Sequence, residues 1–176
     1  KLFFRGRFDA RAYAMGLARL EPVYAALEEG LRTHENTRVF LRHPIMREAA
    51  VRSDRRRYGE GVDPVDTPYA RRIRDVTESA PHRLVGHVYV RYFADLSGVA
   101  KMARVAHRLL GLPADAPLAY FSFPAEVDKQ AVKTELRAAI DRLERRHHEA
   151  VIDEARRSFR LHKELTDELL SVLERS

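Results

Sequence analysis

The chain has 176 residues, of which 45% are hydrophobic, so it can form one domain around a sizeable core. It contains no cysteine, which excludes disulfides, thiolate metal sites and cysteine nucleophiles and is consistent with a cytoplasmic location. Its 32 basic and 26 acidic residues give a net charge of +6, but the basic residues are dispersed and match no nucleic-acid-binding motif.

The first part of the chain is predicted to form three helices. Apolar residues recur at spacings of three and four from Tyr13 to Leu31, which indicates one face of a helix that begins after Asp9 as N-cap. Pro22 lies inside this helix, where it removes a backbone hydrogen bond and is expected to bend the helix. The other two predicted helices cover residues 43–57 and, after Thr67 as N-cap, residues 68–79.

The second part is predicted to contain the longest helix, an irregular connection and two further helices. The longest apolar segment begins at Pro81 and ends at Gly111, because glycine commonly terminates helices. Residues 112–124 are expected to form a partly buried connection, followed by helices over residues 127–145 and 149–175. No alternating run is long enough to predict a sheet, and no apolar run of about 18 residues predicts a membrane span. The sequence therefore predicts an all-α helical bundle with its site between facing helices.

Three residues of the longest helix stand out, because Arg91, Asp95 and Gly98 have the spacing i, i+4 and i+7 and lie on one helix face. A charged pair on a largely apolar helix forms either a salt bridge at the rim of the bundle or part of a functional pocket. A glycine inside a helix costs roughly 0.5–1 kcal/mol relative to alanine. That cost is offset where a flat macrocycle, or a crossing helix, closely approaches the backbone. The spacing alone leaves both alternatives open.

The segment around these residues resembles the signature of the haem oxygenases, His-x-Tyr-x-Arg-Tyr-x-Gly-Asp-Leu-Ser-Gly-Gly. From His87 to Val99 this chain has the sequence HVYVRYFADLSGV, with the same order and spacing. The resemblance continues at FFRGRFDARAYAMGLARLEPVYAALEEGL, at YFSFP and at VIDEARRSFRLHKEL, and so covers nearly the whole chain. It implies a single domain, residues 1–176, of a fold in which haem is sandwiched between a proximal helix with an axial histidine and the glycine-bearing distal helix.

The resemblance also implies an enzyme for which haem is both cofactor and substrate. Reductant and O2 would convert haem to biliverdin, carbon monoxide and ferrous iron. The electrons are expected from an external reductase or ferredoxin-type donor, an acidic protein that suits a basic chain, and the chain is expected to be a monomer or a weak dimer. Asp95 is expected to hold the water network that supplies protons. Arg91 and Tyr24 would be its network partners, and His162 occupies a position that is often polar in the family.

Haem-contacting residues are implied on three helices. Residues Ala94, Ser97 and Gly98 would lie against the macrocycle, Phe159 would form an aromatic wall, and Tyr89, Lys133 and Arg137 would bind the propionates. Lys133 and Arg137 form a like-charge i, i+4 pair, which is unfavourable on a helix unless an anion lies nearby. The alternative is that Arg137 pairs with Asp141.

The chain departs from the family pattern in ways that leave two alternatives open. Ala94 and Val99 stand where the family has glycines, which favours a haem- or bilin-binding protein without turnover. No histidine aligns with the axial ligand, and His87 is expected at the surface. We therefore expect the ligand on a helix upstream of Lys1 that is missing from this chain. The missing ligand by itself favours a helical interaction module without a ligand.

Glu144 and His147 have the spacing of half a di-iron carboxylate motif, but the sequence contains no second half on another helix.

Overall fold

The computed structural model describes residues 9–113 and 115–175, except for the side chains of residues 99 and 100. In this part of the chain the secondary structure is helical, without strands, and the all-α prediction is confirmed. The α-helices are α1 (Ala10–Thr33), α2 (Glu48–Tyr58), α3 (Pro68–Ser79), α4 (Leu84–Leu109), α5 (Lys129–Asp141) and α6 (His148–Arg175). Short 3-10 helices lie between them: η2 (Glu35–Leu41), η3 (Pro81–Arg83), η4 (Ala119–Phe121) and η5 (Arg145–His147). None of the helices in the described residues is long and apolar enough to cross a membrane.

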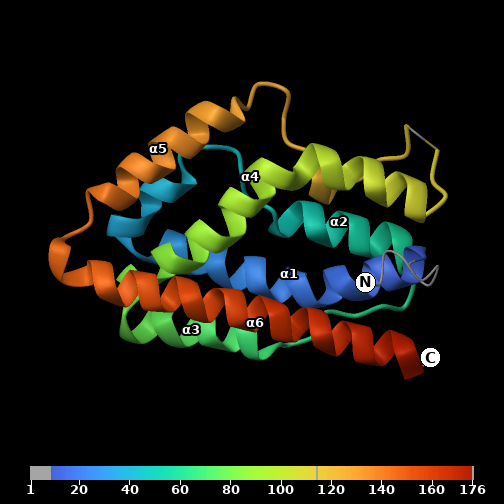
Figure 1. Cartoon of the computed structure of the whole chain (residues 1–176), viewed down its shortest axis with the longest axis horizontal. Coiled ribbons are helices and arrows are strands. Elements are labelled where there is room, and N and C mark those ends of the chain that lie inside the picture. Colours follow the sequence, from blue (N-terminus) through green and yellow to red (C-terminus); the bar gives the residue numbers. More distant parts are fainter. Residues whose placement is uncertain (1–8, 114, 176) are drawn as a thin grey trace.

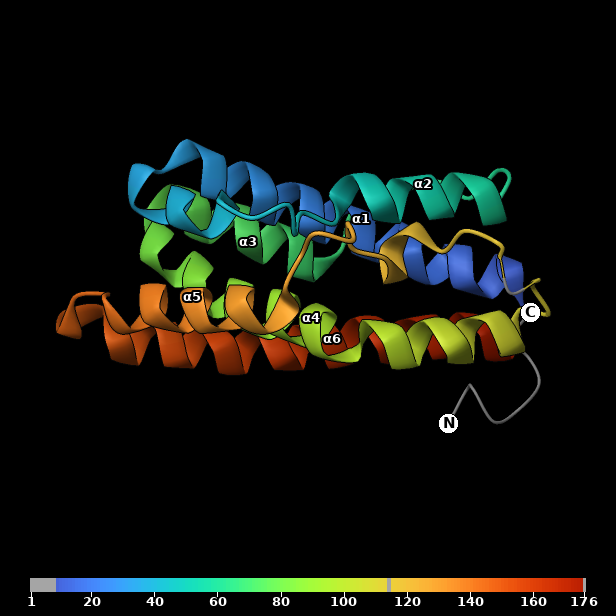
Figure 2. The same cartoon turned by 90° about the horizontal axis from the view of Figure 1, so that it is seen from above.

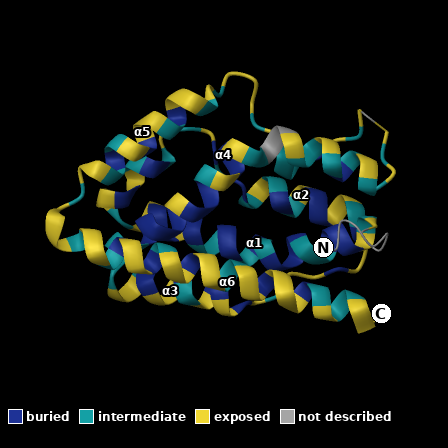
Figure 3. Cartoon of the chain, in the orientation of Figure 1, coloured by how far each residue is buried: buried dark blue, intermediate teal, exposed yellow. Residues whose placement is uncertain are grey.

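The helices form two layers, which are seen edge-on in Figure 2. One layer contains α1, α2 and α3, and the other contains α4, α5 and α6 (Figures 1 and 2). Helix α1 contacts α2, α3, α4 and α6 and lies at the centre of the molecule. Its side chains, with those of α3 and α4, supply most of the apolar core, whereas the outer side of α6 is exposed (Figure 3). This arrangement places the face of α4 that carries Asp95 against α1.

Two helix starts follow from local sequence as predicted. The carboxylate of Asp9 accepts a hydrogen bond of 2.8 Å from the amide of Ala12 and caps α1, which then continues through Pro22 as one helix. The hydroxyl of Thr67 accepts a bond from the amide of Ala70 and caps α3.

The start of α2 was predicted wrongly, because its cap comes from another helix. The predicted helix over residues 43–57 begins only at Glu48. The carboxylate of Glu28, on α1, accepts hydrogen bonds from the amides of Arg47 (2.6 Å) and Glu48 (2.9 Å). Free amides at a helix start need acceptors, and here a side chain from α1 supplies one. Helix α5 is also shorter than predicted, since it starts after Asp128 as N-cap and ends at Asp141.

Candidate functional site

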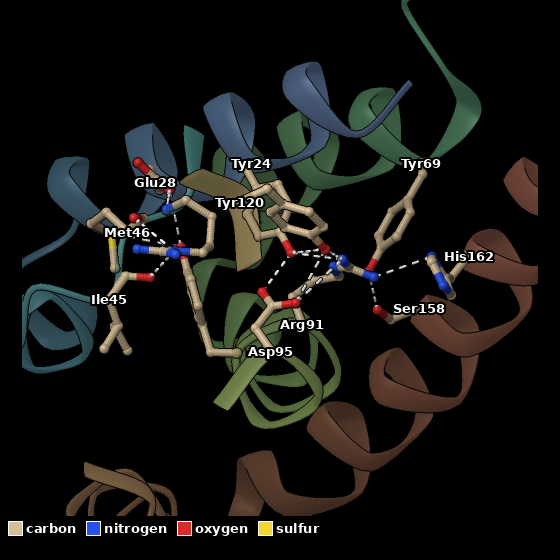
Figure 4. Close-up of polar contacts among 12 residues, drawn as sticks. Tyr24, Glu28, Ile45, Met46, Tyr69, Arg91, Asp95, Tyr120, Ser158 and His162 are labelled. Carbon is tan, nitrogen blue, oxygen red and sulfur yellow. Dashed lines mark hydrogen bonds and ion pairs between the residues drawn. The ribbon is translucent and has the colours of Figure 1, made fainter. Parts of the chain in front are cut away.

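A buried polar network lies where α4 faces α1 and the connection that contains η4 (Figure 4). Arg91 and Asp95 lie one turn apart on α4, Tyr24 comes from α1 and Tyr120 from η4. The side chains of Arg91, Asp95 and Tyr24 are nearly inaccessible, with exposed fractions of 4%, 7% and 0%. Buried polar groups of this kind must satisfy one another, so their hydrogen bonds define the site.

Two phenol groups connect the guanidinium of Arg91 to the carboxylate of Asp95. The hydroxyl of Tyr24 donates to Oδ2 of Asp95 (2.5 Å), and the hydroxyl of Tyr120 donates to Oδ1 (3.2 Å). Nη2 of Arg91 donates to both phenol oxygens, at 2.6 Å for Tyr24 and 3.1 Å for Tyr120. The direct distance from Nη2 of Arg91 to Oδ1 of Asp95 is 3.8 Å. The guanidinium of Arg91 and the carboxylate of Asp95 are therefore connected mainly through the hydrogen bonds of the two phenols.

Burial and neighbouring charge act in opposite directions on Asp95. Burial raises the pKa of the Asp95 carboxyl above its usual range, while the positive charge of Arg91 and the hydrogen bonds from Tyr24 and Tyr120 oppose that rise. The same environment raises the pKa of Arg91, because its own burial is outweighed by the two tyrosines and Asp95. Arg91 is thus a fixed positive charge. Asp95 is a carboxylate whose pKa lies closer to neutrality than usual, which suits a group that holds and passes on protons.

His162, on α6, completes the network on the far side of Arg91. Its Nδ1 lies 3.1 Å from Nη1 of Arg91. Burial, together with the positive charge of Arg91, lowers the pKa of His162 to about 4. The imidazole is therefore neutral near pH 7 and accepts the hydrogen bond from Arg91 at Nδ1. The structure thus brings together the four residues expected from the sequence to handle protons: Tyr24, Arg91, Asp95 and His162.

The low pKa of His162 predicts that the fold loses stability as the pH falls from about 6.5 towards 4. In this window the unfolded chain, with a histidine pKa of about 6.5, binds a proton that the folded chain does not, so acidification favours unfolding. The contribution should be about 1–3 kcal/mol, and urea denaturation between pH 7.5 and 4.5 measures it. The variant His162→Gln should reduce the pH slope, while the exposed-histidine control His148→Gln should keep it. An unchanged slope in His162→Gln would contradict this assignment.

Two glycines of α4 have opposite surroundings. A Cβ added to Gly86 would lie 2.7 Å from the amide nitrogen of Ala155 and 2.8 Å from the carbonyl oxygen of Val151, both on α6. A Cβ added to Gly98 would meet no described atom within 4 Å. Gly86 is therefore the glycine at which α6 crosses, and Gly98 faces open space. The helix-crossing alternative for Gly98 is not supported by any contact among the described residues.

The remaining predicted haem contacts on α4 and α6 lie at accessible positions. Ala94 and Ser97 are exposed, Tyr89 is 47% exposed, and Phe159 on α6 is 57% exposed. Their side chains are thus free of the core and accessible to a ligand.

On α5, Lys133 is half-buried and Arg137 is exposed. The guanidinium carbon of Arg137 lies 5.3 Å from the ring centre of Phe93, and no ion pair with Asp141 is seen in the described part of the chain. Lys133 likewise has no carboxylate partner there. The like charges therefore have no anion to balance them within the described structure.

The prediction for His87 was wrong. Its exposed fraction is 0%, and its Nε2 lies 3.2 Å from Oε1 of Glu154, which is itself 1% exposed. Burial lowers the pKa of His87. His87 is covered because α6 crosses α4 at Gly86, a tertiary contact that the sequence pattern does not reveal.

Glu154 is the centre of a second buried cluster that the sequence did not reveal. Its carboxylate accepts two hydrogen bonds from Arg72 (2.9 and 2.6 Å) and one from Arg83 (3.3 Å). Although burial raises the pKa of Glu154, the bonds from Arg72 and His87 outweigh this and hold the pKa well below its usual range. This cluster ties α3 and η3 to α6 and lies at the N-terminal end of α4, 11 residues before Gly98.

Tyr120 was not predicted as a site residue, although the YFSFP segment that contains it is part of the family resemblance. The sequence offered one indication, namely a tyrosine in a segment expected to be partly buried. A buried tyrosine needs a hydrogen-bond partner for its hydroxyl. Glu144, in contrast, takes part in no metal-type site: it pairs with Arg146 at 2.9 Å, and no group of three potential metal ligands is found among the described residues.

The site thus combines an open glycine face with a buried carboxylate network on one helix of an all-α bundle. The chain matches the family described as Heme oxygenase over residues 1–168, and it belongs to that family. The predicted resemblance is confirmed.

Relatives and solved structures agree with this assignment. The chain is 30% identical to Heme oxygenase 1 of Homo sapiens over 185 residues, covering 97% of this chain and 64% of that protein. It is 28% identical to Heme oxygenase 1 of Synechocystis over 187 residues, covering 96% and 75%. The crystal structure of heme oxygenase-1 from Synechocystis in complex with heme superposes with a TM-score of 0.87 at 26% identity, covering 99% of this chain and 84% of that chain. For heme oxygenase from Leptospira interrogans the TM-score is 0.82 at 27% identity, covering 95% and 87%. The chain spans 64–65% of the length of mammalian relatives.

Proposed function

We propose that this protein is a haem oxygenase that cleaves haem to biliverdin, carbon monoxide and ferrous iron with O2 and an external reductant. The observation that carries the proposal is the position of Asp95, held by Tyr24, Tyr120 and Arg91 one turn before the open backbone at Gly98. Membership of the family and similarity to a haem complex support it.

The residues present fit haem in shape and in charge. Open space at Gly98 accommodates a flat macrocycle against the helix, with Ala94 and Ser97 on the same exposed side. Lys133 and Arg137 would hold the two propionates, and Tyr89 would contribute a further contact. The Nε atom of Arg91 is buried without a hydrogen-bond partner in the described structure, which leaves a donor for a water or a ligand atom.

Each group of the network has a defined task in this proposal. Haem supplies the redox-active iron and the carbon skeleton that is cleaved. Asp95 holds the proton-donating waters, because both of its oxygens keep a lone pair beyond the phenol bonds. Arg91 balances the carboxylate charge. His162 accepts from Arg91 and fixes the plane of the guanidinium. Proton delivery through a carboxylate and water, rather than from a charged histidine, is consistent with the low pKa of His162.

Turnover is the better-supported form of the proposal. Ala94 is exposed, so its methyl group lies on the open face without displacing any part of the network. The side chain of Val99 lies outside the described residues. Curated relatives at 28–30% identity are named Heme oxygenase 1, which supports turnover over haem or bilin binding without turnover and over a module without a ligand.

The axial ligand is a separate proposal, namely that it lies outside residues 1–176. His162 is bound to Arg91, and His87 is buried against Glu154, 11 residues before Gly98 and about 16 Å away along the helix. Neither is placed to bind iron over the open face. Several other points also stay predictions: an external reductant, an acidic donor protein, the oligomeric state, the cytoplasmic location and the domain bounds.

A haem titration of the 176-residue chain, followed by its Soret band, tests both proposals. We expect about one haem per chain, bound weakly and without a histidine-type spectrum, and a shift to that spectrum when imidazole is added. With reductant and O2, the imidazole-supplemented complex should form biliverdin.

The control is Gly98→Leu, which fills the open space. It should keep the fold, raise stability towards urea by about 0.5–1 kcal/mol because an interior helical glycine is replaced, and weaken haem binding. A histidine-type spectrum without imidazole would contradict the ligand proposal. Equal haem binding by Gly98→Leu would contradict the proposed binding face.

A further inference from the structure

We infer that Tyr120 is a positioning residue for this chemistry, because its hydroxyl bridges Oδ1 of Asp95 and Nη2 of Arg91 and so fixes the carboxylate that handles protons. The inference rests on the proposed function for its catalytic consequence. The hydrogen bonds of the Tyr120 hydroxyl on which the inference rests are present in the haem-free chain. They can therefore be tested without haem.

The hydrogens of the network balance only when Tyr120 is present. Nη2 of Arg91 has two hydrogens, and one goes to each phenol oxygen. Each phenol has one hydrogen, and each donates it to a different oxygen of Asp95. The 3.2 Å contact between the two hydroxyls therefore needs no hydrogen of its own. Without the Tyr120 hydroxyl, one donor of Arg91 and one oxygen of Asp95 lose their partner.

The two phenols differ in their access to solvent. Tyr24 has an exposed fraction of 0%, whereas Tyr120 is only half-buried. The Tyr120 hydroxyl itself is bonded to Oδ1 of Asp95 and Nη2 of Arg91. It is a fixed donor to Oδ1, which restricts the orientation of the carboxylate.

A second buried carboxylate holds Tyr120 in place. Asp54, on α2, is 1% exposed and accepts hydrogen bonds of 2.9 Å from the amides of both Ala119 and Tyr120. It also accepts a 2.8 Å bond from the hydroxyl of Tyr13. Arg47 binds the same connection further on, at the carbonyl oxygen of Ser122. A connection anchored in this way presents Tyr120 in one position.

Removal of the Tyr120 hydroxyl should change the acidity of Asp95. The groups that face this carboxyl are Arg91 on α4, Tyr24 on α1, Tyr120 on η4 and Arg47 before α2. All of them favour the ionised carboxylate against its burial. The loss of one of these hydrogen bonds raises the pKa of Asp95.

The test compares Tyr120→Phe with Tyr58→Phe. Tyr58 donates to the carbonyl oxygen of Pro117, so the control removes a phenol hydroxyl that binds the same connection without touching Asp95. The first readout is a titration of aspartate carboxyls by 13C NMR in the haem-free protein, with the Asp95 signal assigned through Asp95→Asn. Tyr120→Phe should raise the pKa of Asp95 by about 0.5–1 unit, and Tyr58→Phe should leave it unchanged.

The second readout is single-turnover biliverdin formation by the imidazole-supplemented haem complex as a function of pH. Tyr120→Phe should slow it about three- to tenfold and move its acid limb upward by the same shift, with haem affinity within about twofold of the parent. If the parent forms no biliverdin but the carboxyl shift is present, the proposed function fails and the role of Tyr120 stands. An unshifted Asp95 carboxyl in a folded Tyr120→Phe variant overturns the inference.

Asp54→Asn provides an independent route to the same answer should Tyr120→Phe fail to fold. It weakens the anchor of η4 without altering the phenol, so it should shift the Asp95 carboxyl in the same direction. In a folded double variant, Tyr120→Phe should then add little to the shift. Fully additive shifts would mean that Asp54 does not act through Tyr120 and would overturn the anchoring part.

Discussion

Replacement of Asp95 by asparagine is expected to leave haem bound while biliverdin formation falls by about 10²–10⁴-fold, the usual cost of removing a positioned proton-transfer group. The amide keeps the shape of the side chain and still accepts one phenol hydrogen bond, so Arg91 and Tyr24 stay in place. The amide cannot carry the proton that the carboxylate carries. Haem affinity from the Soret titration and biliverdin yield per turnover separate the two effects.

The alanine variant at Asp95 tests the same point with a larger disturbance. It leaves the buried guanidinium of Arg91 without its carboxylate, so it should also lose stability. The matched control is the double variant Lys133→Ala with Arg137→Ala, which should weaken haem binding and leave proton delivery intact. Parental biliverdin formation by both Asp95 variants would move the proton role to His162 or Arg91. Complete loss of haem from folded Asp95→Asn would make Asp95 a structural partner of Arg91.

Removal of the Glu154 carboxylate should cause a large loss of stability. Glu154→Ala leaves Arg72 and Arg83 without their shared acceptor in a place that is 1% exposed, and breaking such a buried pair costs about 3–5 kcal/mol. Urea denaturation at pH 7 measures the difference. The neighbouring Asp153→Ala is the control, because Asp153 forms an exposed pair with Arg156 (3.1 Å) worth about 0–1 kcal/mol. Similar losses for the two variants would contradict the structural role of the Glu154 cluster.

Sequence reasoning succeeded where the controlling interactions are local. The N-caps Asp9 and Thr67 bind amides three residues away, so their signal lies within one turn of chain. The family signature likewise places Arg91 and Asp95 on one face of one helix.

Sequence reasoning failed where a distant segment decides the outcome. The start of α2 depends on Glu28, 19 and 20 residues away from the amides that it caps. The burial of His87 depends on the crossing of α6 at Gly86. The role of Tyr120 depends on Asp54, which binds its amide from 66 residues away. No local pattern carries these contacts, and only the packed structure reveals them.

The long sequence separations within the network also bear on when the site comes into existence. The bond between Tyr24 and Asp95 spans 71 residues, and the contact between Tyr24 and Tyr120 spans 96. Contacts that close such long loops form late, after local helices, because the chain entropy of closure must be overcome first. A partly folded chain can therefore hold most of its helices and yet lack an assembled proton-handling centre. The proposed proton delivery would therefore become available only when the last tertiary contacts close, so completion of the fold would itself be the step that activates the site.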